Sequence, residues 1–204
     1  MIRDNREYRF IPIFDVEKRA ETDEETGFVE GYASTFDEYT LFEIEGIEYK
    51  ERIEPTAFDG TDMSDVVFLK DHEGTVFART KNGSITLSVN DHGLFTRTDL
   101  TRTSAAKQML EEIRAEMYTQ MSFAFVVDDD EYDERTHTRI IRHVKKIYDI
   151  SAVSFPANYY TDISVATRSR FDGFIECERR RERERAEKVQ RIKELLKGVD
   201  PDEA

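Results

Sequence analysis

Residues 84–100, SITLSVNDHGLFTRTDL, are the stretch that decides the class of fold. Ile85, Leu87 and Val89 alternate with hydroxyl residues, and this period of two is typical of a half-buried β-strand. The turn-forming residues 90–93 follow, and a second apolar run begins at Leu94. The pattern predicts a β-hairpin.

Outward from this hairpin, most of the chain also has the pattern of strands. We expect strands at 6–16, 28–36, 66–69, 119–127, 138–145 and 147–155, a hairpin over 41–53, and an acidic loop over 128–134. Apolar residues recur at helical spacing only from Ala106 to Met117, where Thr103 or Ser104 would cap a helix. The predicted fold is mostly β (α+β), a closed or strongly curved β-barrel with one or two packed helices.

Composition changes near the C-terminus, and the change predicts two domains. Residues 168–197 contain 11 basic and 7 acidic residues, a net charge of +4, whereas the whole chain carries −14. We therefore predict a β-barrel domain over 1–167 and a charged helical tail over 168–204. The tail is either a solvated helix rich in ion pairs or a basic element that docks on an acidic partner.

Composition also excludes several classes of function. The acidic balance opposes binding to nucleic acid, and no stretch approaches the roughly 18 apolar residues of a membrane span. The first five residues do not resemble a signal peptide. Cys177 is the only cysteine, so a disulfide within the chain is impossible and a reducing compartment is expected.

Among the four histidines, His72 has the most informative position, because it follows a predicted apolar strand where a rigid scaffold meets a loop. Its neighbours Asp71 and Glu73 suggest metal ligation at first sight. Adjacent residues of a strand point to opposite faces, however, and no common zinc motif is present. We expect neither a metal nor a cofactor.

Two polar residues interrupt apolar strands, which makes them candidates for chemistry. Ser122 lies within MSFAFVV and shares one strand face with Ala124 and Val126. From the pattern alone it is either a satisfied core serine or a presented nucleophile. Asp149 lies within IYDISAV, and a buried carboxylate there needs a partner such as an imidazole N–H. The residue types allow a Ser-His-Asp triad but do not establish it.

Six segments together resemble the prohead (capsid maturation) serine proteases of tailed bacteriophages. They are GYASTF at 31–36, EPTAF at 54–58, FLKDH at 68–72, Gly93-Leu94, MSFAF at 121–125 and DISAVSFPAN at 149–158. They occur in order across residues 8–166. The resemblance implies a β-barrel like that of the herpesvirus capsid protease, assemblin, with catalytic residues at His72, Ser122 and Asp149. His143 is the substitute third member if a histidine is used.

The resemblance also implies a serine endopeptidase that cleaves segments of the major capsid protein and scaffold, and itself, inside the immature prohead in the host cytoplasm. A homodimer is possible by analogy with assemblin, and the charged tail would be a removable segment or a targeting handle. Arg79, in the segment after His72, is either an oxyanion donor or a surface charge. Two rivals stay open: a catalytically silent scaffold or assembly protein on the same fold, and a hydrolase with metal at His72.

Overall fold

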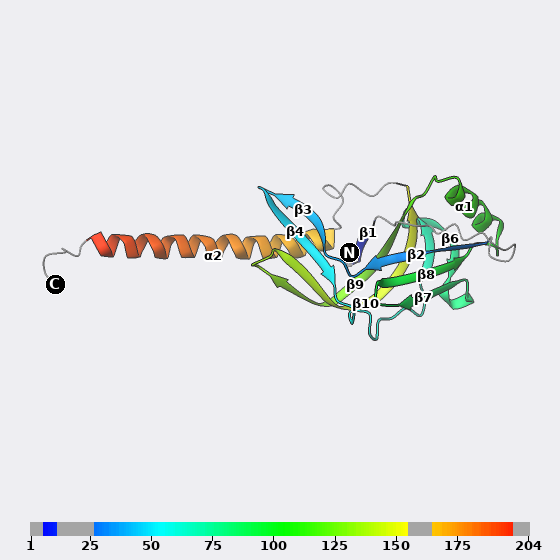
Figure 1. Ribbon diagram of the computed structural model, residues 1–204, viewed down its shortest axis with the longest axis horizontal. Helices are drawn as coiled ribbons and strands as arrows, with labels where there is room; N and C mark the ends of the chain where they lie inside the picture. Colours follow the sequence, from blue (N-terminus) through cyan, green and yellow to red (C-terminus); the bar gives the residue numbers. More distant parts are fainter. Residues whose placement is uncertain (1–5, 12–26, 155–164, 198–204) are drawn as a thin grey trace. The chain divides into compact units, whose positions relative to one another are not determined.

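The computed structural model describes residues 6–11, 27–154 and 165–197 (Figure 1). The chain divides into two compact units, Met1–Ala166 and Thr167–Ala204. The first unit contains two β-sheets and the short helix α1. The second contains nearly all of the helix α2, which spans Val165–Lys197.

Two long antiparallel strands, β9 (Gln120–Asp133) and β10 (Thr138–Val153), form the centre of the larger sheet. Its strand order is β1-β9-β10-β4-β3, and a branch of β5 and β6 pairs with β10 through β5. The other members are β1 (Glu7–Ile11), β3 (Tyr39–Ile44), β4 (Ile47–Ile53), β5 (Val67–Lys70) and β6 (Glu73–Arg79). Because β10 pairs with β4 near its start and with β5 near its end, it brings distant parts of the chain together.

The second sheet has the order β2-β8-β7 and contains the predicted hairpin. Strands β7 (Ile85–Val89) and β8 (Gly93–Asp99) pair antiparallel, and β8 also pairs with β2 (Phe28–Thr35). A short 3-10 helix, η1 (Thr80–Asn82), leads into β7. Gly93 lies so close to β2 that a Cβ there would be 2.0 Å from the Ser34 carbonyl oxygen. The hairpin prediction is confirmed.

Helix α1 (Ser104–Arg114) is also confirmed, including its cap. The Thr103 hydroxyl accepts a hydrogen bond of 3.0 Å from the Ala106 amide, which satisfies a free donor of the first turn. The helix buries one apolar face, made by Ala106, Met109, Leu110 and Ile113. These residues belong to the same hydrophobic core as Phe68, Phe123 and Phe125.

The mostly β class with two helices is confirmed, but the closed barrel is not. In the part of the chain that the structure describes, no strand pairing closes either sheet on itself. The core nevertheless packs both faces of β9, because Met121, Ser122, Phe123, Ala124 and Phe125 are all buried. The candidate nucleophile therefore lies in a fully packed strand.

Two local predictions were wrong, and one strand was not predicted. The expected acidic loop at 128–134 is largely strand, since β9 continues to Asp133. The two expected strands at 138–145 and 147–155 are, up to Val153, the single strand β10, which is interrupted by register shifts rather than a loop, and residue 155 lies outside the described residues. Strand β6 was not predicted, because its first residues are polar or exposed. The predicted strand at 6–16 is observed as β1, and residues 12–16 lie outside the described residues.

The C-terminal helix α2 is the charged helix expected from the sequence. It consists largely of Glu and Arg over residues 176–188 and ends at Lys197. Within the described ranges, no helix combines the length and apolar character needed to cross a membrane.

Candidate active site

His72 lies in a two-residue turn between β5 and β6, where Lys70 pairs with Glu73. Asp71 and His72 both have positive φ angles, 48° and 61°, as in the tight type I′ turns that connect antiparallel strands. Residues other than glycine seldom adopt this region, although aspartate, asparagine and histidine do so more often than the rest, and contacts with the surroundings help to hold the turn. The Asp71 amide supplies part of it by donating to the Ala152 carbonyl of β10 at 3.0 Å.

The strand register places the other candidate residues next to this turn. Ser122 on β9 is the direct partner of Ser151 on β10, and Asp149 lies two residues from Ser151 on the same face. Asp149 is in turn the parallel partner of Val67 on β5. The turn after β5 therefore brings His72 over β10 and towards Ser122.

The three predicted residues form a continuous hydrogen-bonded chain. His72 Nδ1 is 2.6 Å from Asp149 Oδ1, and His72 Nε2 is 2.7 Å from Ser122 Oγ. A carboxylate can only accept hydrogen bonds, so Nδ1 carries the proton of the neutral ring and Nε2 is left as an acceptor for the serine hydroxyl. This is the tautomer that a serine nucleophile requires of its base.

The site is well shielded from solvent. The side chains of His72 and Asp149 are 11% and 5% exposed, and Ser122 is fully buried. On its other side, Ser122 Oγ lies 2.8 Å from the Arg9 carbonyl oxygen of β1. The single hydroxyl hydrogen is thus directed either to His72 or to Arg9. The ring of Tyr8 packs edge-on against the imidazole, with ring centroids 4.7 Å apart.

The imidazole of His72 thus lies between a buried carboxylate and a strand serine. The family model described as caudovirus prohead serine protease matches residues 14–172, about three-quarters of the chain. The chain belongs to the caudovirus prohead serine protease family. This membership confirms the resemblance inferred from the sequence, and the matched range includes His72, Ser122 and Asp149. Searches of curated proteins and of solved structures found no significant match.

His143, the substitute third member, lies elsewhere. Its Nδ1 is 2.5 Å from the Asp128 carboxylate and its Nε2 is 3.1 Å from the Asp59 carbonyl oxygen. Among the described contacts, the carboxylate that meets the His72 ring is that of Asp149. The aspartate side chain is long enough for this contact.

The remaining candidates from the sequence also lie outside the hydrogen-bonded set of Asp149, His72 and Ser122. The guanidinium of Arg79 donates to Asp65, with Nη2 2.7 Å from Oδ2. Hydrogen bonds from Arg79 and Lys81 hold the pKa of Asp65 well below its usual range. The carboxylate of Asp71 accepts from the Ser154 amide at 3.1 Å. Among the residues described, no three His, Cys, Asp or Glu side chains converge as metal ligands.

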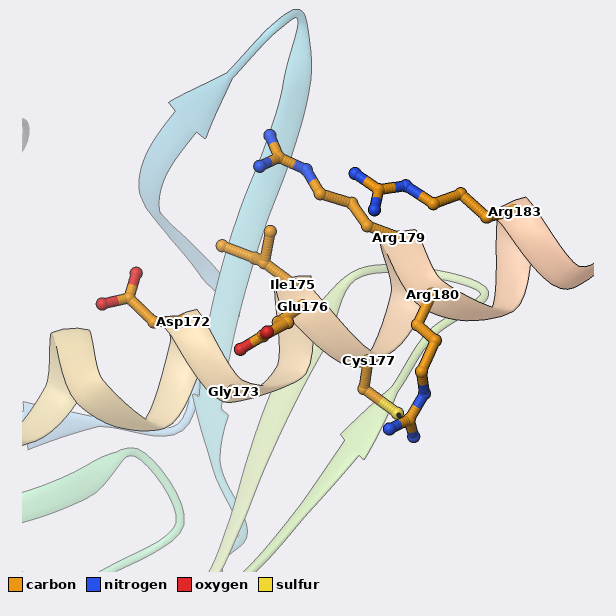
Figure 2. Close-up of a pocket in the computed structure, with 8 residues that line it drawn as sticks. All are labelled: Asp172, Gly173, Ile175, Glu176, Cys177, Arg179, Arg180 and Arg183. Carbon is orange, nitrogen blue, oxygen red and sulfur yellow. Dashed lines mark hydrogen bonds between the residues drawn. The ribbon is translucent and has the colours of Figure 1, made fainter.

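A surface hollow along α2 contains none of the triad residues. Figure 2 shows its lining of Asp172, Gly173, Ile175, Glu176, Cys177, Arg179, Arg180 and Arg183. Arg179 and Arg183 extend from the same side of the helix, whereas Arg180 extends beside Cys177. An Arg180 nitrogen lies 3.8 Å from Cys177 Sγ.

A buried ion cluster, which was not predicted from the sequence, anchors β1. Arg9 and Arg139 donate to the carboxylates of Glu7 and Glu51, and Arg139 also donates to Asp130 at 2.6 Å. Four of these residues, Glu7, Arg9, Glu51 and Arg139, are at most 3% exposed. Burial alone would raise the pKa of Glu7, but Arg9 and Arg139 outweigh it and lower this pKa to about 2.

The ion cluster matters for the site because it fixes the strand that covers Ser122. The side chain of Arg9 is bound in the cluster, and the carbonyl of the same residue contacts the Ser122 hydroxyl. The Tyr39 hydroxyl adds a 2.6 Å hydrogen bond to Glu51, and its pKa is raised by burial and by the Glu51 charge. No local pattern in the sequence indicates this cluster, because its arginines and glutamates come from β1, β4 and β10.

Proposed function

We propose that this member of the phage maturation protease family is an active serine endopeptidase that uses Ser122 as nucleophile, His72 as general base and Asp149 as the residue that orients the base. The observation that carries the proposal is the 2.7 Å contact between His72 Nε2 and Ser122 Oγ. A base within hydrogen-bond reach is the requirement for activating a serine hydroxyl.

The reaction follows from the tautomer. Ser122 Oγ attacks the carbonyl carbon of a peptide bond while its proton passes to His72 Nε2. Asp149 stabilises the imidazolium that forms, because its carboxylate already accepts from Nδ1 at 2.6 Å. The imidazolium then protonates the departing amine. A water molecule, deprotonated by the same nitrogen, hydrolyses the acyl-enzyme and regenerates Ser122.

Access to the nucleophile sets a condition on this mechanism. A substrate carbonyl must reach Ser122 Oγ, which is fully buried and lies against the Arg9 carbonyl of β1. The reaction therefore requires local movement of the groups that bury Ser122, among them the backbone at the Arg9 carbonyl. The buried ion cluster opposes this movement, since it binds the Arg9 side chain.

For substrates we propose segments of the major capsid protein and of the scaffold, cleaved inside the immature prohead in the host cytoplasm, together with cleavage of the protease itself. The support is membership of the caudovirus prohead serine protease family. The helix α2 would then be the removable or targeting segment. A homodimer stays a prediction.

Co-expression with the phage's own major capsid protein tests this function. Intact-mass spectrometry should show trimmed capsid chains with the wild-type protease and full-length chains with Ser122→Ala. The matched control is Ser34→Ala, which removes another fully buried serine hydroxyl, in the second sheet. Full-length capsid chains with the folded wild-type protease would instead support the catalytically silent assembly protein.

A further inference from the structure

A fourth polar side chain contacts two members of the triad. Ser151 is fully buried on β10, directly opposite Ser122. Its Oγ lies 2.9 Å from Asp149 Oδ1, 3.2 Å from His72 Nδ1 and 3.2 Å from the His72 backbone nitrogen. The Ser151 hydroxyl thus contacts both the Asp149 carboxylate and the backbone amide of His72.

The direction of each hydrogen bond follows from the donors available. The His72 backbone N–H can only donate, so Ser151 Oγ accepts from it. The Asp149 carboxylate can only accept, so the single Ser151 hydrogen goes to Oδ1. Nδ1 of His72 donates to the same carboxylate oxygen. Asp149 Oδ1 therefore receives two hydrogens, one from the imidazole and one from Ser151.

This geometry connects the strained backbone of the base to its carboxylate. His72 has a φ of 61°, which lies in the left-handed region that residues with a Cβ seldom adopt. Ser151 holds the amide of this residue and fixes the carboxylate rotamer at the same time. A displacement of about 1 Å at such a site is enough to reduce a rate by two orders of magnitude.

We propose that Ser151 is a positioning residue of the active site, which fixes the His72 backbone and the Asp149 carboxylate relative to each other. The proposal rests on the proposed function, because it assigns a role in serine activation. Ser151 does not contact the nucleophile's oxygen in the described contacts, so it acts through His72 and Asp149 rather than on substrate.

The test is a double-mutant cycle read by the rate of fluorophosphonate labelling at Ser122. Wild type, Ser151→Ala, Asp149→Ala and the double variant are compared, with thermal midpoints measured in parallel. Ser151→Ala should slow labelling about 10- to 100-fold, because it removes a hydrogen bond to a charged group and one to the base's backbone. In the Asp149→Ala background the same change should cost clearly less, by at least about threefold, since the carboxylate contact is gone and only the contact to the His72 backbone amide is left.

Two controls separate positioning from general destabilisation. Ser34→Ala should leave the labelling rate within about twofold, because its hydroxyl donates to the Thr35 carbonyl at 3.3 Å and, among the described contacts, reaches no member of the triad. Ser151→Thr keeps the hydroxyl and should recover most of the lost rate wherever its thermal midpoint matches that of wild type. If Thr disrupts packing at this buried position, the cycle alone decides.

Each outcome has a defined meaning. Equal losses from Ser151→Ala in both backgrounds, or a loss below threefold in the wild-type background, would overturn the positioning role while leaving the serine protease intact. A folded wild-type protein that does not label at Ser122 would overturn the proposed function and the positioning role with it.

Discussion

Replacing Asp149 by asparagine tests the orienting role with little change in size. The carboxylate is 5% exposed and accepts hydrogen bonds from His72 Nδ1 at 2.6 Å and from Ser151 at 2.9 Å. An asparagine that donates its amide hydrogen to Nδ1 would move the imidazole proton to Nε2. Nε2 could then no longer accept the Ser122 proton.

The expected loss can be estimated from the equivalent change in a serine protease triad, which lowers kcat about 10⁴-fold. That factor corresponds to about 5.4 kcal/mol of transition-state stabilisation. We expect Asp149→Asn to reduce kcat/KM for peptide cleavage by about this factor near neutral pH. The thermal midpoint should fall much less than it would on removal of a buried charge pair, because the asparagine amide can still form hydrogen bonds.

The assay is steady-state cleavage of a peptide taken from the mapped capsid-cleavage site. Asp71→Asn is the matched control, because this neighbouring carboxylate binds Ser154 rather than His72. His143→Ala is a second control, and it should change kcat/KM less than about threefold because its ring contacts Asp128 and Asp59. A loss below tenfold for Asp149→Asn, or an equal loss for His143→Ala, would refute the assignment of the third residue.

Other predictions concern the framework. Arg139→Met should lower the free energy of unfolding by about 3–5 kcal/mol in urea titrations, because it leaves buried carboxylates without their cation. Arg142→Met, at an exposed pair, should cost less than about 1 kcal/mol, and equal costs would contradict the account. The pKa of Glu7 is about 2 in the folded protein against 4.5 when unfolded, so its contribution to the free energy of unfolding is complete above pH 4.5 and is lost between pH 4.5 and 2. Glu7→Gln should flatten the dependence of the free energy of unfolding on pH over that range. Gly93→Ala should cost more than about 2 kcal/mol by thermal melting, since its Cβ would overlap β2, and an unchanged midpoint would disprove that contact.

The parts of the fold that sequence predicted are those whose stability is local. The hairpin of β7 and β8 has a clean alternation and a turn, and α1 has a cap and an apolar face within eleven residues. Strand positions for Ser122 and Asp149 followed from the apolar residues around them. Their contact through His72 depended on the family resemblance, because nothing local indicates that β5 lies beside β10.

The parts that sequence missed depend on contacts between distant segments. Residues 128–133 are acidic and were interpreted as a loop, yet they pair with β10, where Arg139 and Arg142 bind Asp130 and Glu131. These cross-strand pairs stabilise a strand whose own composition disfavours it. The ion cluster joins Glu7 to Arg139 across 132 positions, which no local pattern can reveal.

Ser151 shows how a site residue is overlooked. It lies in the same apolar strand as Asp149, two positions away, and a small buried serine has an ordinary structural explanation. The informative signal was its spacing from Asp149, since residues at i and i+2 share a strand face. Only the register of β9 against β10 shows that this face also carries Ser122.

The most direct test of the central claim is to label the folded protein with a fluorophosphonate and map the adduct by tandem mass spectrometry. The account predicts a single adduct at Ser122 that disappears in His72→Ala and Ser122→Ala and persists in Ser34→Ala. An adduct at any other serine, or labelling of Ser122 that does not depend on His72, would contradict it.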